Sequence, residues 1–528
     1  MENFIRKFLN KFIPYFLVIS YFFIISSDFY AQDTTKSLAF KNNRPQRNNP
    51  YFYRPDLAYQ IWQQFKLNQE ANSGDALAQH ELGLRYLLGD GIPADTVKAI
   101  YWIKKAAESN LTAAKYNLGI MLINGIGIKW NPFLAFKYFR SAAREGMLQA
   151  QYVLGILYTD NLIVKRDWNL AYYWIKKSAD GDFESAKEVL PELEPKISKK
   201  VVDSLFNIKT FAVSEQPDHS DDTQIPSSLG LMFIDFNNIQ DTTFTLTDSM
   251  IVSDLRLAQD DSLVSDLKTD SVKNISEIIS EKNLSLINEL AENGSPEAQT
   301  LLGRMYEEGI FYNSNIIKAA SFYYRALRND SPKATNILWR LSGKKEFISQ
   351  IMKEAKSGNG EAKFVWYGLT SIGFDNRIVI NDAVKLLTES AYNGYLPAIT
   401  ELGLNYYTGR DVNKNPDRGI LLWKEAEQKG STEATIRLIS AELLDGIYYD
   451  GPKKDFQKLL DFSEKGSLLA QVTIAICYEQ GYSVKPSIPD AVKYYRYAAQ
   501  RGNQFAYNQL KRLYDSIRPE EPEFTISN

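Results

Sequence analysis

The strongest constraint on the fold is an apolar pattern that returns at intervals of 36 residues. Ala99, Trp102, Ile103, Ala106 and Ala107 are spaced as one face of an α-helix. Equivalent stretches, with small and aromatic residues in the same slots, begin at Ala135, Ala171, Ala319, Ala383 and Ala491. A repeat of this length predicts stacked copies of one supersecondary unit.

A glycine closes most units at the same interval. Glycine and asparagine are the residues that most readily adopt the left-handed backbone ending a helix. The predicted helix-ending glycines are Gly74, Gly146, Gly294, Gly358, Gly394, Gly430, Gly466 and Gly502, with Asn110 in an equivalent slot and Gly181 one position early. Asp330 and Gly358 are only 28 residues apart, so a loop or a helix end is expected to be trimmed between them.

Each unit also contains an earlier helix, as at residues 76–91, 113–127 and 150–160. In the first copy Ala78, Leu82 and Tyr86 lie on one stripe, and Gly83 lies at its edge. A glycine at that edge lets the neighbouring helix approach closely. One such helical hairpin cannot bury its apolar stripe alone, whereas stacked copies bury it in a continuous core.

These residues resemble the Sel-one-like repeat, a relative of the tetratricopeptide repeat. The pattern A-x-x-x-L-G-x-x-Y, G-x-G, K-A-x-x-W-x-x-K-A-A is matched by Ala78, Leu82, Gly83, Tyr86, Gly89, Gly91, Lys98, Ala99, Trp102, Lys105, Ala106 and Ala107. The resemblance covers roughly 74–186 and 294–502, with a degenerate copy at 431–466. It implies an all-α solenoid, a right-handed superhelix of antiparallel helix pairs, serving mainly as a scaffold or adaptor for other proteins.

The first residues have the pattern of a targeting segment. Arg6, Lys7 and Lys11 precede an apolar run at 12–25, which is shorter than the roughly 20 residues that span a bilayer as a helix. We expect residues 1–31 to be a signal peptide cut between Ala31 and Gln32, followed by a polar leader at 32–53. A retained anchor is the alternative.

The rest of the chain divides into two repeat blocks. The first is predicted at 54–194, with a capping helix within 55–74, and the second at 284–518, with a closing helix at 503–517 and a tail at 519–528. Residues 213–270 carry 12 acidic side chains against 2 basic ones, so 195–283 is predicted to be a largely disordered acidic insert. Its apolar stretch 229–236 is expected to dock as a strand or short segment. Binding of a basic partner or of divalent cations is the alternative role for the insert.

Residue types that carry catalysis are few. His80 is predicted to be a surface or groove residue of a first helix, His219 to be solvated, and Cys477 to be a buried, inert thiol. One cysteine cannot build a disulfide framework or a multi-cysteine metal site, and no metalloprotease helix or phosphate-binding loop is present. No metal or cofactor is therefore expected. A pair of carboxylates converging across repeats, as in a glycosidase, stays open.

The function predicted from these features is a non-enzymatic, exported scaffold, either periplasmic or secreted. Its protein or peptide partner is expected on the concave side, which the polar positions of the first helices would line. The 61 basic and 64 acidic side chains nearly cancel, which argues against nucleic acid. No stable membrane insertion is expected after signal cleavage. The alternatives are a cell-envelope hydrolase and a regulator of an envelope or secretion complex.

Overall fold

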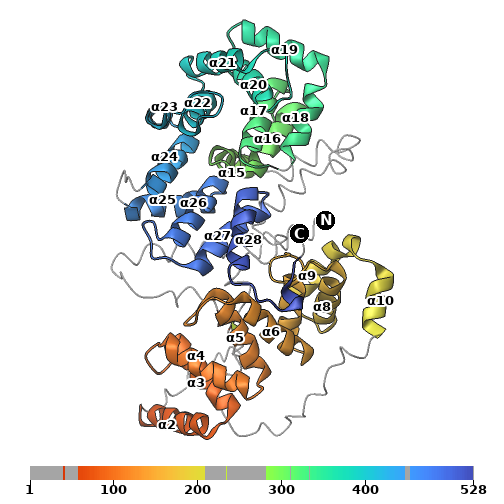
Figure 1. Cartoon of the computed structure of the whole chain (residues 1–528), viewed down its shortest axis with the longest axis vertical. Coiled ribbons are helices and arrows are strands. Elements are labelled where there is room, and N and C mark those ends of the chain that lie inside the picture. Colours follow the sequence, from red (N-terminus) through yellow and green to blue (C-terminus); the bar gives the residue numbers. More distant parts are fainter. Residues whose placement is uncertain are drawn as a thin grey trace.

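The protein is an all-α solenoid built from consecutive helix pairs (Figure 1). The computed structural model describes residues 40–41, 57–207, 233–234, 281–309, 311–331, 333–445 and 452–526. The predicted cleavage site between Ala31 and Gln32 lies outside these residues, as do His219 and most of the predicted acidic insert. Two short strands, β1 (Phe40–Lys41) and β2 (Phe233–Ile234), form one antiparallel pair.

The first block contains three helix pairs, preceded by one helix and followed by two, and the last of these lies at 199–207, within the range predicted to be the insert. The capping helix predicted within 55–74 is confirmed as α2. The elements in chain order are α2 (Leu57–Ser73), α3 (Ala76–Leu88), α4 (Thr96–Glu108), α5 (Thr112–Asn124), α6 (Pro132–Arg144), α7 (Leu148–Leu157), α8 (Trp168–Asp180), α9 (Glu184–Leu193), the 3-10 turn η1 (Glu194–Lys196) and α10 (Lys199–Asn207).

The second block contains six helix pairs between an entry helix and the predicted closing helix, α28. Its elements are α15 (Glu281–Glu292), α16 (Pro296–Glu308), α17 (Ile316–Arg328), α18 (Ala334–Ser342), α19 (Lys345–Lys356), α20 (Gly360–Ser371), α21 (Ile380–Tyr392), α22 (Leu396–Thr408), α23 (Pro416–Gln428), α24 (Thr432–Asp445), α25 (Pro452–Glu464), α26 (Leu468–Gln480), α27 (Ile488–Gln500), α28 (Gln504–Asp515) and the 3-10 turn η3 (Pro522–Phe524).

Most second helices begin at a short polar residue that caps their free backbone N–H groups. The Asp95 carboxylate accepts a hydrogen bond of 3.0 Å from the backbone N–H of Lys98. Such a bond satisfies a donor that has no partner within the helix. The equivalent caps are Asn131, Asp167, Asn315, Asn415 and Ser487. The repeat therefore fixes where each second helix starts.

The predicted closing glycines all have a left-handed backbone, with φ between 81° and 102°. Asn110 adopts it as well, at φ 68°. Gly181 does not: its φ is −85°, and the left-handed residue is Asp182, at φ 75°. Asp182 lies 36 residues after Gly146, so the interval is kept and only the residue type changes.

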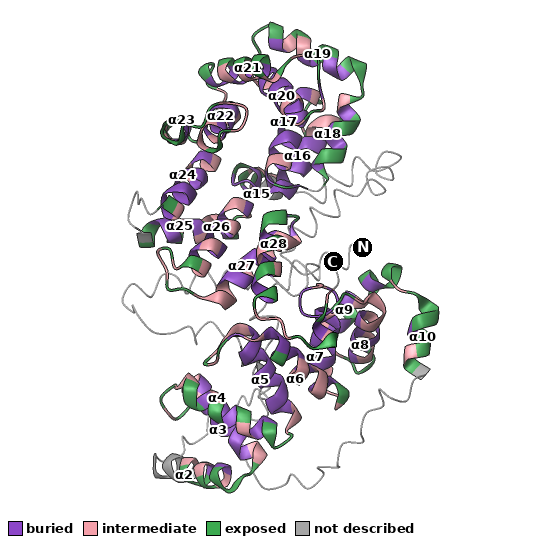
Figure 2. Ribbon diagram, in the orientation of Figure 1, coloured by how far each residue is buried: buried purple, intermediate pink, exposed green. Residues whose placement is uncertain are grey.

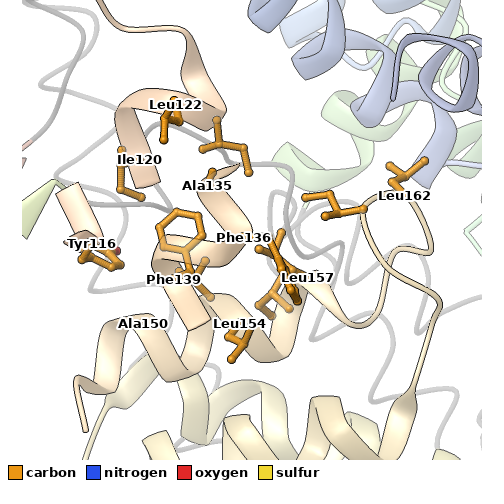
Figure 3. Close-up of a cluster of buried hydrophobic side chains, with 14 of the residues drawn as sticks. Tyr116, Ile120, Leu122, Ala135, Phe136, Phe139, Ala150, Leu154, Leu157 and Leu162 are labelled. Carbon is orange, nitrogen blue, oxygen red and sulfur yellow. The ribbon is translucent and has the colours of Figure 1, made fainter. Parts of the chain in front are cut away.

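A glycine in the first helix of the units lets the second helix pack directly on its backbone. A Cβ added to Gly83 would lie 2.6 Å from Cγ1 of Ile103, as the edge position of this glycine predicts. At Gly119 the added atom would lie 2.6 Å from Cε1 of Phe139. Phe139 stands at the centre of the buried cluster of the first block (Figure 3).

The shortened unit consists of α18 and α19, which lie at the outer side of the second block (Figure 1). Their displacement allows α20 to pack on α17 as well as on its own partner α21. Gly368 in α20 faces the ring of Tyr324 in α17, where an added Cβ would lie 2.8 Å from Cγ. In this shortened unit α17 and α20 are therefore direct neighbours, although α18 and α19 lie between them in the sequence.

The second block closes on itself. Arg501, just after α27, forms a buried ion pair of 2.7 Å with Glu297 in α16, and also donates to the carbonyl oxygen of Gly466. Beside it, Asn503 donates a hydrogen bond of 2.7 Å to Asp330, and burial raises the pKa of that carboxyl group. The first and last units of this block are thus direct neighbours.

The two blocks share one core through α27, α28 and the residues that follow (Figures 1 and 2). Arg496 in α27 forms a 2.8 Å ion pair with Asp160, which follows α7, and donates to the Tyr514 hydroxyl. The Tyr514 ring packs edge-on against Trp130, with centroids 5.2 Å apart. Within the predicted tail, Phe524 is fully buried against Phe133 and Phe136 of the first block.

Candidate interaction surfaces

Polar residues of the first helices join neighbouring units. The Gln79 side-chain amide donates a hydrogen bond of 3.0 Å to the carbonyl oxygen of Ala71, at the end of the preceding helix. Gln151 does the same with Ala143 at 3.1 Å. These glutamines are buried, as is Lys115 in the equivalent slot, which pairs with the carboxylates and amides of neighbouring residues. Such positions hold the stack together. They do not line an open groove, although the polar positions of the first helices were predicted to do so.

His80 belongs to this set of buried residues. The prediction of a surface or groove position is wrong, because its side chain is only 1% exposed. Its Nε2 lies 2.8 Å from the Asn117 side-chain amide on α5, which places the imidazole between two units. Burial lowers the pKa of His80 to about 4. The ring is therefore neutral near pH 7 and has no contact with solvent through which it could act on a substrate.

Cys477 is confirmed as a buried thiol on α26. Burial raises the pKa of Cys477 to about 12, because the thiolate would lose its hydration. The thiol form therefore persists at neutral pH, and it is unreactive toward electrophiles. This supports the predicted structural role.

The interior of the second block contains a buried carboxylate held by arginines. Glu401 on α22 lies 3.1 Å from the guanidinium of Arg328 and pairs with Arg410, while Tyr324 donates to it at 2.9 Å. Burial alone would raise its pKa, but Arg328, Arg410 and Arg437 together hold the pKa of Glu401 at about 2. A carboxylate this strongly ionised cannot act as a general acid near neutral pH.

A second group of charges joins α17 to helices on either side of it. Arg325 in α17 lies 3.3 Å from Glu292 in α15 and 3.7 Å from Glu433 in α24, and its side chain is 9% exposed. Since Glu401 is tied to α17 in the same way through Arg328, helices α22 and α24 both contact α17 across the inside of the curve. These ion pairs therefore connect α17 to helices that are distant from it in the sequence.

One shallow depression lies between the start of α21 and the loop after α22. Its lining is Asn381, Val384, Gly409, Asp411, Val412 and Asn413. The Asp411 carboxylate accepts hydrogen bonds from the hydroxyl groups of Tyr367 and Ser371 at 2.8 and 2.6 Å. The one acidic group in this lining is thus engaged within the protein and has no second carboxylate beside it in the lining.

The inner row of the first block has an extended segment against it. Strand β2 lies against α5, the middle first helix of this block. Its partner β1 pairs with it so that Phe40 is opposite Ile234 and Lys41 is opposite Phe233. The prediction that the apolar stretch 229–236 docks as a short strand is confirmed for Phe233–Ile234. An extended chain can therefore be accommodated at α5.

The outer face of α4 contains three lysines beside two aromatic residues. Lys98 and Lys104 are exposed. The Lys105 ammonium lies over the rings of Tyr101 and Trp102, 4.9 and 5.4 Å from their centroids. Trp102 itself is buried in the stack. The aromatic residue of this motif therefore builds the unit, and the lysines lie at its edge.

Among the residues with defined positions, no group of histidine, cysteine and acidic side chains is arranged to bind a metal ion. None of the helices described combines the length and the apolar character required to cross a bilayer.

Several features of these surfaces were not predicted. The helix caps at Asp95, Asn131 and Asp167 are spaced by 36 residues, so the sequence contained that signal. Gln79 and Gln151, which make equivalent hydrogen bonds, are separated by two intervals of 36 residues. By contrast, no local pattern indicates that Arg501 meets Glu297, because this contact depends on the curvature of the whole block.

Comparison with known proteins gives the same repeat. The Sel1 repeat model matches residues 76–111, 112–147, 148–183, 296–331, 396–431 and 468–503. Among solved structures, the chain is similar to c5321, a protective antigen of uropathogenic Escherichia coli with an SLR fold (20% identity, 86% of this chain and 91% of that one, TM-score 0.31). It is also similar to a Sel1 repeat protein of Oxalobacter formigenes (39% identity, 24% of this chain and 97% of that one, TM-score 0.24).

Curated relatives match over shorter parts. The yeast Chitin synthase regulator SKT5 is 24% identical over 42% of this chain and 35% of its own length. The rat DAP3-binding cell death enhancer 1 is 30% identical over 19% of this chain and 19% of its own length. The chain thus spans about a third of the length of the yeast protein and about a fifth of the length of the rat protein. The chain therefore contains six Sel1 repeats, and each of them forms a pair of helices in the structure.

Proposed function

We propose that this protein is a non-enzymatic scaffold, exported to the periplasm or secreted, that holds a protein or peptide partner on the inner face of its first block. The observation that carries the proposal is strand β2, an extended segment lying against α5. In the second block, Arg325 and Glu401 tie α17 to α22 and α24 across the inner face. The strand at α5 therefore favours the first block over the second as the place where an extended partner segment binds.

The family supports a scaffold role, since Sel1 repeat proteins generally act as platforms for other proteins. The yeast relative is named as a regulator, and the rat relative is named as a protein that binds another protein. The matches cover only small parts of those two proteins. A regulator of an envelope or secretion complex differs from the scaffold only in its partner.

The hydrolase alternative has weaker support. His80 is buried and uncharged. Glu401 is an ionised carboxylate that is buried and paired with arginines, so neither residue offers the exposed acid or base that hydrolysis needs. The purified chain is expected to leave generic ester, glycoside and β-lactam substrates unchanged. Turnover that His80→Ala abolishes would replace the scaffold proposal with the hydrolase.

Export rests on the pattern of residues 1–31 and has its own test. Residues 1–40 are fused to a reporter enzyme that is active only outside the cytoplasm. Activity is expected, and it should be lost when Arg6, Lys7 and Lys11 are all replaced by glutamate. Sequencing of the exported chain should begin at Gln32. A cytoplasmic, uncut fusion would contradict export.

Partner binding is tested by freeing α5 from the chain's own strand. Residues 229–236 are replaced by glycine and serine at equal length, and captured proteins are quantified from an envelope fraction. If β2 covers the partner surface, the variant should capture more of a specific protein than the wild type does. Residues 253–260 of the insert, replaced in the same way, are the control. Equal capture by wild type and variant, with no specific protein, would contradict binding at α5.

A further inference from the structure

Helix α6 holds a short segment of the chain as a binding surface holds a peptide. Phe524 in η3 is fully buried. Its ring packs edge-on against Phe133 and Phe136 of α6, with centroids 5.1 and 5.9 Å apart. A buried aromatic anchor between aromatic side chains is the arrangement that dominates the binding energy of protein interfaces.

Basic side chains of α6 surround this anchor and pair with acidic residues of the segment. Lys137 Nζ lies 2.6 Å from Glu521 Oε1, and Arg140 forms a salt bridge with Glu523. Lys137 Nζ also lies 5.5 Å from the centroid of the Phe524 ring. These pairs are partly open to solvent, so each adds little affinity by itself. They do select acidic residues at two defined positions.

The backbone of the segment is held as well. The Arg518 guanidinium donates to the carbonyl oxygen of Phe524 at 2.9 Å. It also donates to the carbonyl oxygens of Leu162 and Ile163, at 2.7 and 3.1 Å, in the loop that follows α7. The aromatic ring, the acidic side chains and the backbone of residues 521–524 therefore all make contacts within one small area.

We propose that the α6 surface formed by Phe133, Phe136, Lys137 and Arg140 recognises acidic peptides of the form Glu-x-Glu-Phe, and that a partner protein with such a segment binds by displacing residues 521–524. Charge complementarity favours this partner, because the two basic side chains face two glutamates in the bound segment. This surface lies on a second helix, outside the inner face discussed above, so it does not depend on partner binding at α5.

The chain's own segment sets a threshold for this binding. A tethered segment competes at an effective concentration on the order of millimolar. A partner must therefore match the Glu-x-Glu-Phe pattern and gain further contacts before it displaces residues 521–524. The wild-type chain should bind an isolated peptide weakly, whereas a chain whose own anchor is removed should bind it well.

The test uses the full-length chain and a fluorescent peptide with the sequence of residues 519–526. By fluorescence anisotropy, Phe524→Ala should bind this peptide, and the wild type should bind it about tenfold or more weakly because of cis competition. Adding Arg140→Glu to Phe524→Ala should abolish binding. The same peptide with alanine in place of phenylalanine should not bind either chain.

A second variant keeps the test decisive if Phe524→Ala disturbs folding. Glu521→Lys combined with Glu523→Lys keeps the anchor but repels the segment from Lys137 and Arg140, and it should also increase peptide binding. Failure of both variants to bind the peptide, or binding that Arg140→Glu leaves unchanged, would overturn the proposal. Self-association of the wild type that Phe524→Ala abolishes would overturn it too, by making a second copy of the chain the occupant.

Discussion

Arg501 and Glu297 form an ion pair across 204 residues, and both side chains are at least nine-tenths buried. The guanidinium makes two bonds to the carboxylate, with Nη2–Oε2 at 2.7 Å and Nε–Oε1 at 3.0 Å. A paired arrangement of this kind fixes both distance and orientation. It joins α16 to the start of α28, which makes the second block a closed array.

Replacing Arg501 by methionine should destabilise the protein strongly. The variant leaves Glu297 buried without its cation, a change that costs about 3–5 kcal/mol in comparable pairs. Urea unfolding at pH 7 measures the loss. Lys429→Met is the control, because Lys429 pairs with Glu425 at the surface and exposed pairs contribute roughly 0–1 kcal/mol. Equal losses in the two variants would show that Arg501 does not close the block.

Acid should weaken the second block through Glu401. Its pKa is about 2 in the folded protein against an ordinary value of 4.5, so the unfolded state takes up the proton first as pH falls. The stabilisation is complete above pH 4.5 and is lost between pH 4.5 and 2, with a total of roughly 3 kcal/mol. Unfolding free energies of wild type and Glu401→Gln, measured across this range, should converge toward pH 2. Parallel curves would contradict the ionised state of Glu401.

Protonation of His80 should destabilise the first block, and it should do so at higher pH than protonation of Glu401. Burial lowers the pKa of His80 from the ordinary value of 6.5 to about 4 in the folded protein, so protonation favours the unfolded state. Stability is therefore complete above pH 6.5 and falls by roughly 3 kcal/mol as pH drops to 4. His80→Gln, which keeps a polar group beside Asn117, should remove this dependence. An imidazole that titrates near pH 6.5 by NMR would refute its burial.

The glycines of the first helices should not tolerate a methyl group. In Gly303→Ala the new Cβ would lie 2.4 Å from Cε1 of Tyr323, so the buried Tyr323 ring or the helix that carries it must shift. Overpacking costs about 1–3 kcal/mol, which outweighs the roughly 1 kcal/mol that alanine contributes to a helix. Gly343→Ala is the matched control, because its nearest neighbour would be 3.6 Å away. Thermal unfolding of both variants checks the difference, and equal midpoints would contradict direct helix contact at Gly303.

The fold was predictable from the sequence because it is local and repeated. Ala99, Trp102 and Ile103 lie on the buried face of α4 as their spacing predicts, and Gly83 marks the helix contact. The left-handed slot at Asp182 was misplaced by one residue, since Gly181 has the preferred residue type but the interval of 36 residues decides the conformation. Periodicity was therefore a better guide than residue identity.

The candidate surfaces were less predictable. A polar residue such as Gln79 or His80 has the same pattern whether it faces solvent or bonds to the next unit, so the sequence could not separate the two cases. The burial of Phe524 was beyond local reasoning for another reason. It depends on how the units of the second block turn until α28 reaches α6, and that angle is a sum over the whole block.

Closure of the second block also determines where unfolding can begin. In a repeat array each unit contacts only the units next to it. The two terminal units of an open array have one such contact each, so they unfold first. The bond between Arg501 and Glu297 gives α16 a neighbour from the far end of the block. Beyond it, α28 is held by the first block through Tyr514 and Trp130. The second block accordingly has no end from which units can peel off one at a time, and it should melt as a single cooperative unit.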